Sequence, residues 1–284
     1  MEGLVIIQII HRFRQRLLVD LRVHARFEVT TPRSAPILRE GVANDEIHLV
    51  SLMDHSPGQG QFRDLEHYVE YYSKWIRGQD ETEAQIRSKA QRLQEAPKAW
   101  HIAQAVAQVS LEKRVPLASH DDDTPEKVSL MAGLGATISE FPVTLEAAQA
   151  AKQRGMWVVM GAPNAYRGGS HSGNLSALEG LRAGVVDGLA SDYHPASMLQ
   201  AAFRLHREGI LELPAAVRLI TQNVAEMCGL ADRGRLEEKF RADLVLVEEG
   251  PHPKVHASLL GGRVVYHDGY LELCPQNPGK TRLR

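Results

Sequence analysis

Short apolar runs that end abruptly in polar and turn residues recur along the chain. They occur at residues 50–59 (VSLMDHSPGQ), 117–122 (LASHDD), 157–164 (WVVMGAPN) and 186–193 (VDGLASDY). Apolar strands that deliver polar side chains at their carboxyl ends, separated by helical stretches, are typical of a parallel α/β barrel. The pattern therefore predicts a TIM-like (β/α) barrel with its functional site at the ends of the strands.

The first expected strand covers residues 19–30, where apolar and polar residues alternate up to Glu28. Five further strands are expected at residues 47–53, 115–119, 137–139, 156–160 and 188–191. A closed barrel of this type needs eight strands, so the sequence predicts a barrel that lacks its first strands.

Helices are expected between these strands. The charged stretch 65–109, interrupted at Pro97, suggests two or three helices, and Thr144 is placed to cap a helix that stops at Gly155. A helix should follow Pro195, and residues 214–228 suggest another. Three regions result: an atypical amino-terminal segment (1–18), the barrel (19–233), and a small β subdomain with a tail (234–284), with strands at 242–247 and 262–269.

Composition narrows the classes of function. The chain has 284 residues and a net charge of −2, which gives no electrostatic reason to expect nucleic acid or an anionic membrane as a partner. Only two cysteines occur, Cys228 and Cys274, in no redox or metal-binding spacing. The apolar stretch 4–10 is far shorter than the roughly 20 residues that span a bilayer. These features predict a soluble cytoplasmic protein.

Four polar residues end expected strands: Glu28, His55, His120 and Asp192. In a barrel they would converge on one face, where carboxylates and imidazoles can hold one or two divalent ions and leave a position for water. Zinc, manganese and iron all suit this donor set. A single such histidine is more often structural, but four at equivalent positions favour a metal site. Asp192 is the expected catalytic base, because a carboxylate beside the water can take its proton.

The loop 167–174 (RGGSHSGN) combines glycines with Arg167, Ser170, His171 and Asn174. Glycines expose backbone N–H donors to an anion, and a guanidinium can clamp a phosphate. The sequence leaves open whether the loop binds phosphate or is a flexible linker. Residues 121–123 (DDD) lack the alternation of a calcium loop and are expected to form a solvated loop or helix cap.

Five strings in this order, VSLMDHSPGQGQF, LASHDDDT, SEFPVTLEAA, MGAPNAYRGGSHSGN and SDYHPAS, resemble a family within the amidohydrolase superfamily, the alpha-D-ribose 1-methylphosphonate 5-triphosphate diphosphatases of the carbon-phosphorus lyase pathway. The resemblance runs from about residue 21 to about residue 265. It implies hydrolysis of a phosphorylated ribose to its 5-phosphate and pyrophosphate. It also implies that Glu28 bridges two metals, His55 and His120 bind one of them, and Asp192 is the last ligand and proton shuttle.

One departure from the family stands out. Its members begin with a strand that ends in His-x-Asp, and no such motif precedes Glu28. We therefore expect open sheet edges, poor solubility or a homo-oligomer, with residues 4–7 covering part of the gap as a strand or helix. Two alternatives stay open: an amidohydrolase that cleaves a C–N bond, of the deacetylase or D-aminoacylase type, and an inactive truncated remnant.

Overall fold

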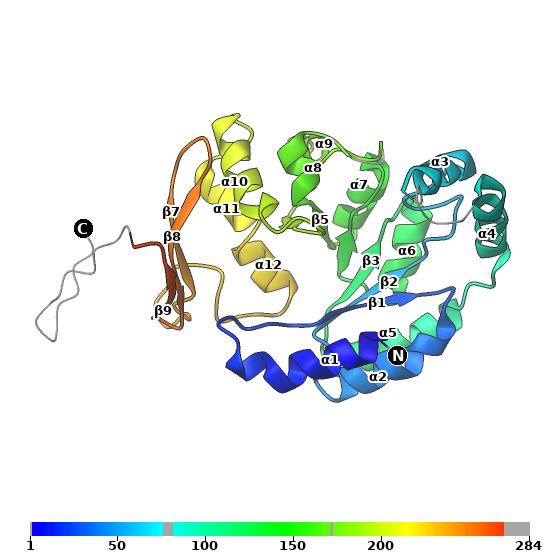
Figure 1. The fold of residues 1–284 in the computed structure, drawn as a ribbon, viewed down its shortest axis with the longest axis horizontal. Coiled ribbons are helices and arrows are strands. Elements are labelled where there is room, and N and C mark those ends of the chain that lie inside the picture. The colour runs from blue at the N-terminus through cyan, green and yellow to red at the C-terminus, as the bar shows by residue number, and fades with distance from the viewer. Residues whose placement is uncertain (1, 76–81, 171–172, 270–284) are drawn as a thin grey trace, which may run out of the picture.

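Six parallel strands form the main sheet, as the sequence predicts. The computed structural model describes residues 2–75, 82–170 and 173–269 (Figure 1). The strands are β1 (His24–Glu28), β2 (Leu49–Met53), β3 (Leu117–His120), β4 (Ile138–Glu140), β5 (Trp157–Gly161) and β6 (Gly188–Ala190). They lie side by side in sequence order, each parallel to the next. Within the described residues, β1 and β6 are the two ends of this sheet.

Helices connect the strands, and the Thr144 cap is confirmed because its side chain accepts a hydrogen bond from the Ala147 amide at 3.1 Å. Between the strands lie α2 (Ala35–Ala43), α3 (Leu65–Trp75), α4 (Glu83–Glu95), α5 (Trp100–Glu112), α6 (Pro125–Gly133), α7 (Leu145–Gln153), α8 (Ala162–Arg167) and α9 (Ala177–Arg182). After β6 come α10 (Ser197–Arg207), α11 (Leu213–Arg218) and α12 (Gln222–Met227), so the single helix expected at 214–228 is two helices. None of the described helices is long and apolar enough to cross a bilayer.

The two faces of the sheet differ in chemistry because successive side chains of a strand point to opposite sides. On one face Phe27, Leu52 and Leu117 are fully buried in the main core, which α2 and α5 help to form. The other face carries His24, Arg26 and Glu28 of β1 together with polar side chains from β2, β3 and β4. The alternation predicted over residues 19–30 is therefore seen as one buried and one polar face, although only residues 24–28 form the strand.

Helix α12 covers part of the polar face of the sheet. Met227 packs there with Ala118, Ile138 and Val159, which lie on the same face as His120 and Glu140. Gly188 makes room for it, since a Cβ at that position would come within 2.8 Å of the Met227 terminal carbon. This apolar layer closes one end of the face and leaves the carboxyl ends of the strands open for chemistry.

The small carboxyl-terminal sheet is antiparallel and contains β7 (Leu244–Glu248), β8 (Lys254–Leu260) and β9 (Arg263–His267). The sequence predicts β7 and β9 but not β8. At the other end of the chain, α1 (Glu2–Phe13) and the 3-10 turn Arg14–Arg16 form a helical segment. Residues 4–7, expected as strand or helix, are helical, and Ile7 joins the main core while Val5, Ile6 and Ile9 are exposed.

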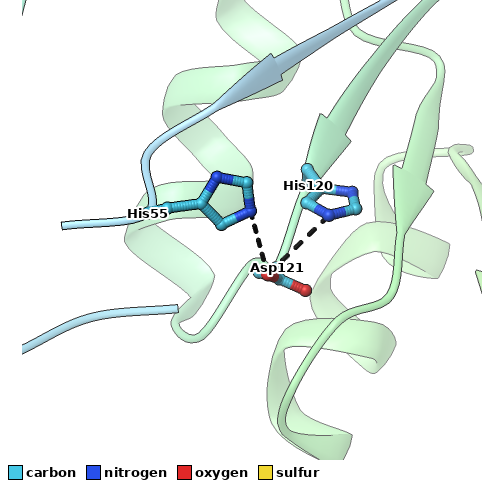
Figure 2. A group of neighbouring side chains, drawn as sticks. All are labelled: His55, His120 and Asp121. Atoms are coloured by element: carbon cyan, nitrogen blue, oxygen red, sulfur yellow. Dashed lines mark ion pairs between the residues drawn. The ribbon is translucent and has the colours of Figure 1, made fainter. Parts of the chain in front are cut away.

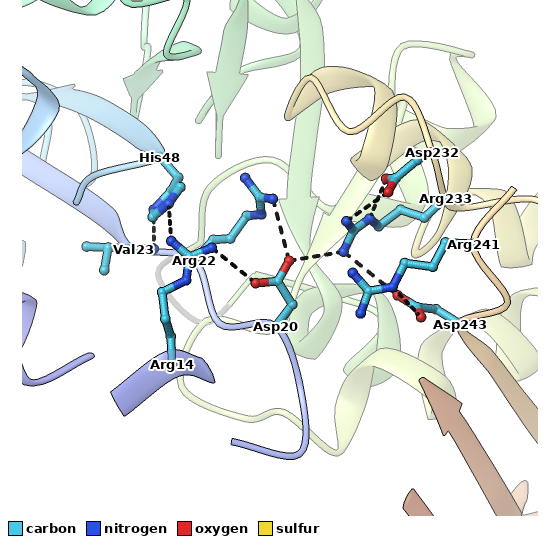
Figure 3. Close-up of polar contacts among 9 residues, drawn as sticks. All are labelled: Arg14, Asp20, Arg22, Val23, His48, Asp232, Arg233, Arg241 and Asp243. Atoms are coloured by element: carbon cyan, nitrogen blue, oxygen red, sulfur yellow. Dashed lines mark hydrogen bonds and ion pairs between the residues drawn. The ribbon is translucent and has the colours of Figure 1, made fainter. Parts of the chain in front are cut away.

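A network of charges joins the amino-terminal segment to the linker that leads into the small sheet (Figure 3). Asp20 accepts hydrogen bonds from Arg14 at 3.3 Å, Arg22 at 3.5 Å and Arg233 at 3.2 Å. Burial alone would raise the pKa of Asp20, but the Arg22 charge and the hydrogen bonds from Arg14 and Arg233 outweigh it and lower the pKa. The ionised carboxylate therefore stabilises the contact between segments more than 200 residues apart.

We expect Asp20→Asn to lower the free energy of unfolding by about 1 kcal/mol near neutral pH. Because the folded-state pKa of Asp20 lies below its unfolded value, this contribution is complete above the unfolded pKa and disappears as pH falls through the folded one. Urea unfolding of wild type and variant between neutral and acidic pH measures the difference. Asp45→Asn, at an exposed acid outside the network, is the control and should change stability by a few tenths at most. An effect that persists in strong acid would contradict the assignment.

Candidate metal centre

The register of β3 and β4 sets the geometry at the centre of the sheet. His120 lies directly opposite Glu140, so their side chains share one face, and His120 Nδ1 is 3.0 Å from Glu140 Oε2. Burial acts to lower the pKa of His120, but the hydrogen bond to Glu140 and the nearby Asp121 charge raise it overall. Burial alone would raise the pKa of Glu140, whereas His120, His24 and Arg26 bring it down to about 2. Glu140 is therefore a buried, ionised carboxylate.

His55 follows β2 in a loop that Asp54 holds in place. The buried Asp54 carboxylate accepts hydrogen bonds from the Ser56 amide at 3.0 Å and from Lys98 Nζ at 3.1 Å. Burial would raise the pKa of Asp54, but these hydrogen bonds and those from the Ser56 and Gln59 side chains lower it. The ionised Asp54 carboxylate thus holds the backbone on both sides of His55, through its own position and its bond to the Ser56 amide.

His55, His120 and Asp121 gather around one point (Figure 2). Asp121 Oδ2 lies 3.7 Å from His55 Nε2 and 3.8 Å from His120 Nε2, and the three ligand atoms all lie within 4.8 Å of one another. Metal–ligand distances near 2.0–2.1 Å separate the ligands of a tetrahedral site by about 3.4 Å, so the spacing fits a divalent cation. Burial raises the pKa of Asp121 despite the two imidazoles, so the neighbouring side chains do not fully compensate its buried negative charge.

Glu28 meets His55 on the opposite side of the ring, with Glu28 Oε2 2.8 Å from Nδ1. His55 is thus flanked by two carboxylates, Glu28 at Nδ1 and Asp121 at Nε2. Either nitrogen can serve as a ligand, so the arrangement fits one or two cations. Of the four ligands predicted from sequence, the structure brings Glu28, His55 and His120 into one connected group.

The histidines open into a cavity of about 560 Å³, a size suited to a small-molecule ligand. Arg167, Ser170, Asn174 and Asp192 line this cavity together with His55, His120 and Asp121. Asp192 is exposed on the wall and is not a member of the three-residue ligand group. Glu28 contacts His55 and is not among the residues that line the cavity. His171 lies outside the described residues.

The loop after α8 is tied down at several points. Arg167 donates a hydrogen bond to the Tyr193 hydroxyl, and Asn174 Nδ2 donates to the Gln61 carbonyl at 3.2 Å. Asn164 bonds both the Leu175 carbonyl and the Ala177 amide. These contacts join the loops that follow β2, β5 and β6 around the cavity, and they argue against a flexible linker for the described part of this loop.

Comparisons with known proteins identify the family. The model of the Amidohydrolase family matches residues 50–266. The chain belongs to the amidohydrolase family. It is 44% identical over 229 residues to the alpha-D-ribose 1-methylphosphonate 5-triphosphate diphosphatase of Escherichia coli (strain K12), a match covering 79% of this chain and 60% of the relative. The chain therefore spans about three fifths of the length of that relative.

Solved structures share the fold at low sequence identity. The ochratoxinase of A. niger has a TM-score of 0.53 at 15% identity, covering 83% of this chain and 55% of that one. The N-acetylglucosamine-6-phosphate deacetylase of Pasteurella multocida has a TM-score of 0.51 at 11% identity, covering 91% and 80%. The predicted amidohydrolase-type fold with a small carboxyl-terminal sheet is confirmed.

The backbone of this amidohydrolase is strained where its strands end at the site. Asp121, Phe141 and Asp192 have φ angles of 52°, 57° and 48°, in the left-handed region that residues with a side chain seldom adopt. Each follows β3, β4 or β6 by one or two residues. Such conformations persist only where the surroundings impose them, and they gather at functional sites.

Sequence reasoning missed two acids of the amidohydrolase site. The expectation that residues 121–123 form a solvated loop or cap is wrong for Asp121 and Asp122, which are 7% and 0% exposed. Glu140 was not proposed at all, although it ends β4 as His120 ends β3. The signal that could have found Asp121 and Glu140 is their place at strand ends, the same signal that identified Glu28.

We expect zinc to stabilise the chelator-treated amidohydrolase against unfolding, by about 2.7 kcal/mol when free zinc is 100 times its dissociation constant. His120→Ala and Asp121→Asn should each remove most of this gain, because each deletes a ligand at the centre of the group. Thermal unfolding with and without zinc measures it. His206→Ala is the matched control at a half-buried histidine outside the site and should keep the zinc effect. Equal zinc stabilisation in all variants would refute the site.

Proposed function

We propose that this chain is a metal-dependent diphosphatase that hydrolyses alpha-D-ribose 1-methylphosphonate 5-triphosphate to the 5-phosphate and pyrophosphate. One observation carries the proposal: the metal-ligand group and Arg167 open into the same cavity, in a chain 44% identical to the E. coli diphosphatase. A cytoplasmic location remains a prediction from the cysteine content.

The donor set favours zinc, with manganese or iron as the other candidates. His55, His120, Asp121 and Glu28 would hold one or two cations, with Asp192 completing the ligands from the cavity wall. When bound, the metal would polarise a phosphoryl oxygen and acidify a water molecule. The side chains that line the cavity would orient the ester and move the proton.

Asp192 is the proposed base. Its carboxylate lines the cavity and is exposed, so it is free to accept a proton from the attacking water and return it to the leaving pyrophosphate. The water oxygen forms the new P–O bond at the α-phosphorus, and the bond to the oxygen bridging the α- and β-phosphates breaks. Two groups are released, the ribose 5-phosphate and pyrophosphate.

The loop after α8 supplies the proposed contacts to the triphosphate. The Arg167 guanidinium can bind two phosphate oxygens at once, which a lysine cannot. Ser170 and Asn174 line the same wall, and His171 stays a predicted contact. Tyr193 Oη accepts a hydrogen bond from Arg167, which holds the guanidinium at the mouth of the cavity.

We expect Asp192→Asn to lower kcat for pyrophosphate release by about 10²- to 10⁴-fold, because an amide cannot accept the proton. The assay follows pyrophosphate released from the ribose triphosphate by protein loaded with zinc, manganese or iron(II) after chelation. Asp45→Asn, at an exposed acid far from the cavity, is the control. The C–N alternative is tested in parallel by amine release from N-acyl amino acids. Amine release without pyrophosphate release would overturn the proposed substrate.

Arg167→Ala should raise KM for the triphosphate by about tenfold or more, since a charge-assisted hydrogen bond is worth about 1.5–3 kcal/mol. Arg167→Lys should restore only part of this loss. Tyr193→Phe removes the neighbouring hydroxyl but keeps the guanidinium, so its effect should be smaller. An unchanged KM in Arg167→Ala would place the triphosphate elsewhere in the cavity.

A further inference from the structure

We propose that Glu140 is a positioning residue, which holds the proton of the neutral His120 ring on Nδ1 and so presents the Nε2 lone pair to the metal position. The inference rests on the metal-dependent function proposed above, but its main test uses metal-free protein without substrate. It concerns a buried acid that the sequence did not suggest.

The strand register provides the first step. His120 and Glu140 end adjacent parallel strands and lie directly opposite each other, so Nδ1 meets Glu140 Oε2 at 3.0 Å. The ring is also confined by Phe141, whose ring centre lies 5.4 Å away at an interplanar angle of 60°. With Nδ1 held against Glu140, the opposite nitrogen Nε2 faces Asp121.

The other partners of Glu140 fix the direction of the hydrogen bonds. Ser51 Oγ donates to Glu140 Oε2 at 2.9 Å, and the His24 ring lies 2.6 Å from Ser51 Oγ through its Nε2. Because Ser51 has one proton and gives it to Glu140, His24 must donate to Ser51. Arg26 Nη2 lies 3.7 Å from Glu140 Oε1. Because an ionised carboxylate can only accept hydrogen bonds, the contact between Glu140 and His120 requires the ring to donate through Nδ1.

Two carboxylates compete for the single proton of a neutral His120. Glu140 is 3.0 Å from Nδ1, and Asp121 Oδ2 is 3.8 Å from Nε2. The shorter contact lies within hydrogen-bond distance and the longer one does not, so the proton belongs on Nδ1. A metal ligand needs the lone pair and not the N–H at Nε2, and a carboxylate behind a ligand histidine commonly selects this tautomer.

The competition makes the effect of substitution specific. Glu140→Gln keeps the shape of the side chain but removes its charge, so the Asp121 carboxylate becomes the stronger attraction and should move the proton to Nε2. Asp121→Asn should do the opposite and leave the proton on Nδ1, although it removes a ligand. A merely structural role for Glu140 predicts no such exchange.

Asp122→Asn is a matched control. Asp122 is a fully buried carboxylate two residues from His120, and it accepts hydrogen bonds from Ser119 and Ser139, whose side chains belong to the opposite face of β3 and β4. Asp122 therefore resembles Glu140 in its burial, and Asp122→Asn removes one negative charge just as Glu140→Gln does. It has no direct part in placing the proton of His120.

The experiment records 15N resonances of the histidine rings in the metal-free full chain under alkaline conditions, where the rings are neutral, with His120 assigned by comparison with His120→Gln. Wild type, Asp121→Asn and Asp122→Asn should show a lone-pair nitrogen at Nε2, and Glu140→Gln should show it at Nδ1. Zinc affinity, measured by competition with a chromophoric chelator, should fall about 10- to 100-fold in Glu140→Gln and stay within about twofold in Asp122→Asn.

A lone pair on Nδ1 in wild type overturns the proposal, whatever the variants do. So does Glu140→Gln with unchanged tautomer and unchanged zinc affinity. If Glu140→Gln does not fold, Glu140→Asp keeps the charge, withdraws the carboxylate by one methylene and should shift both readouts in the same direction. Failure of pyrophosphate release with the expected tautomers and zinc affinities would refute the proposed substrate and leave the role of Glu140 intact.

Discussion

Parallel pairing of neighbouring strands is the constraint on which the site depends. In a parallel sheet, the carboxyl ends of successive strands meet at one edge, and residues in register point to the same face. This places Glu140 opposite His120 and sets Glu28 close to the loop that carries His55. A shift of one residue in β4 would turn Glu140 to the other face and remove the carboxylate from His120.

The site combines buried charge with an apolar floor. On the same face as the polar side chains, Met227 of α12 packs against Ala118, Ile138 and Val159. This apolar packing keeps water from that end of the sheet. In such surroundings charges interact strongly, so an unpaired acid would be costly. Glu140 meets this demand with donors from several strands, whereas Asp121 has two imidazoles beyond hydrogen-bond distance. The negative charge of Asp121 is therefore less well compensated than that of Glu140, and a bound cation would supply the missing positive charge.

The two sides of the cavity are carried by different kinds of secondary structure. The side with His55, His120 and Asp121 is built on strand ends and the residues that directly follow them. The side with Arg167 and Asn174 is built on loops that are joined to one another. Arg167 with Tyr193, and Asn174 with the Gln61 carbonyl, make these loop contacts. Rigid strands suit the sub-ångström demands of metal ligation, while loops suit recognition of the extended triphosphate that we propose as the substrate.

The sequence alone determined the parallel strands, the capped helix at Thr144 and the grouping of Glu28, His55 and His120, because periodicity and strand-end chemistry are local signals. Strand β8, the division of the 214–228 helix and helix α1 were settled by packing. Only the tertiary structure decided that Asp121 is buried between two imidazoles and that Glu140 backs His120. The contact of Glu140 with His120 spans 20 residues, and the approach of His55 to Asp121 joins loops that follow two different strands. No local pattern encodes which acid at a strand end meets which ring.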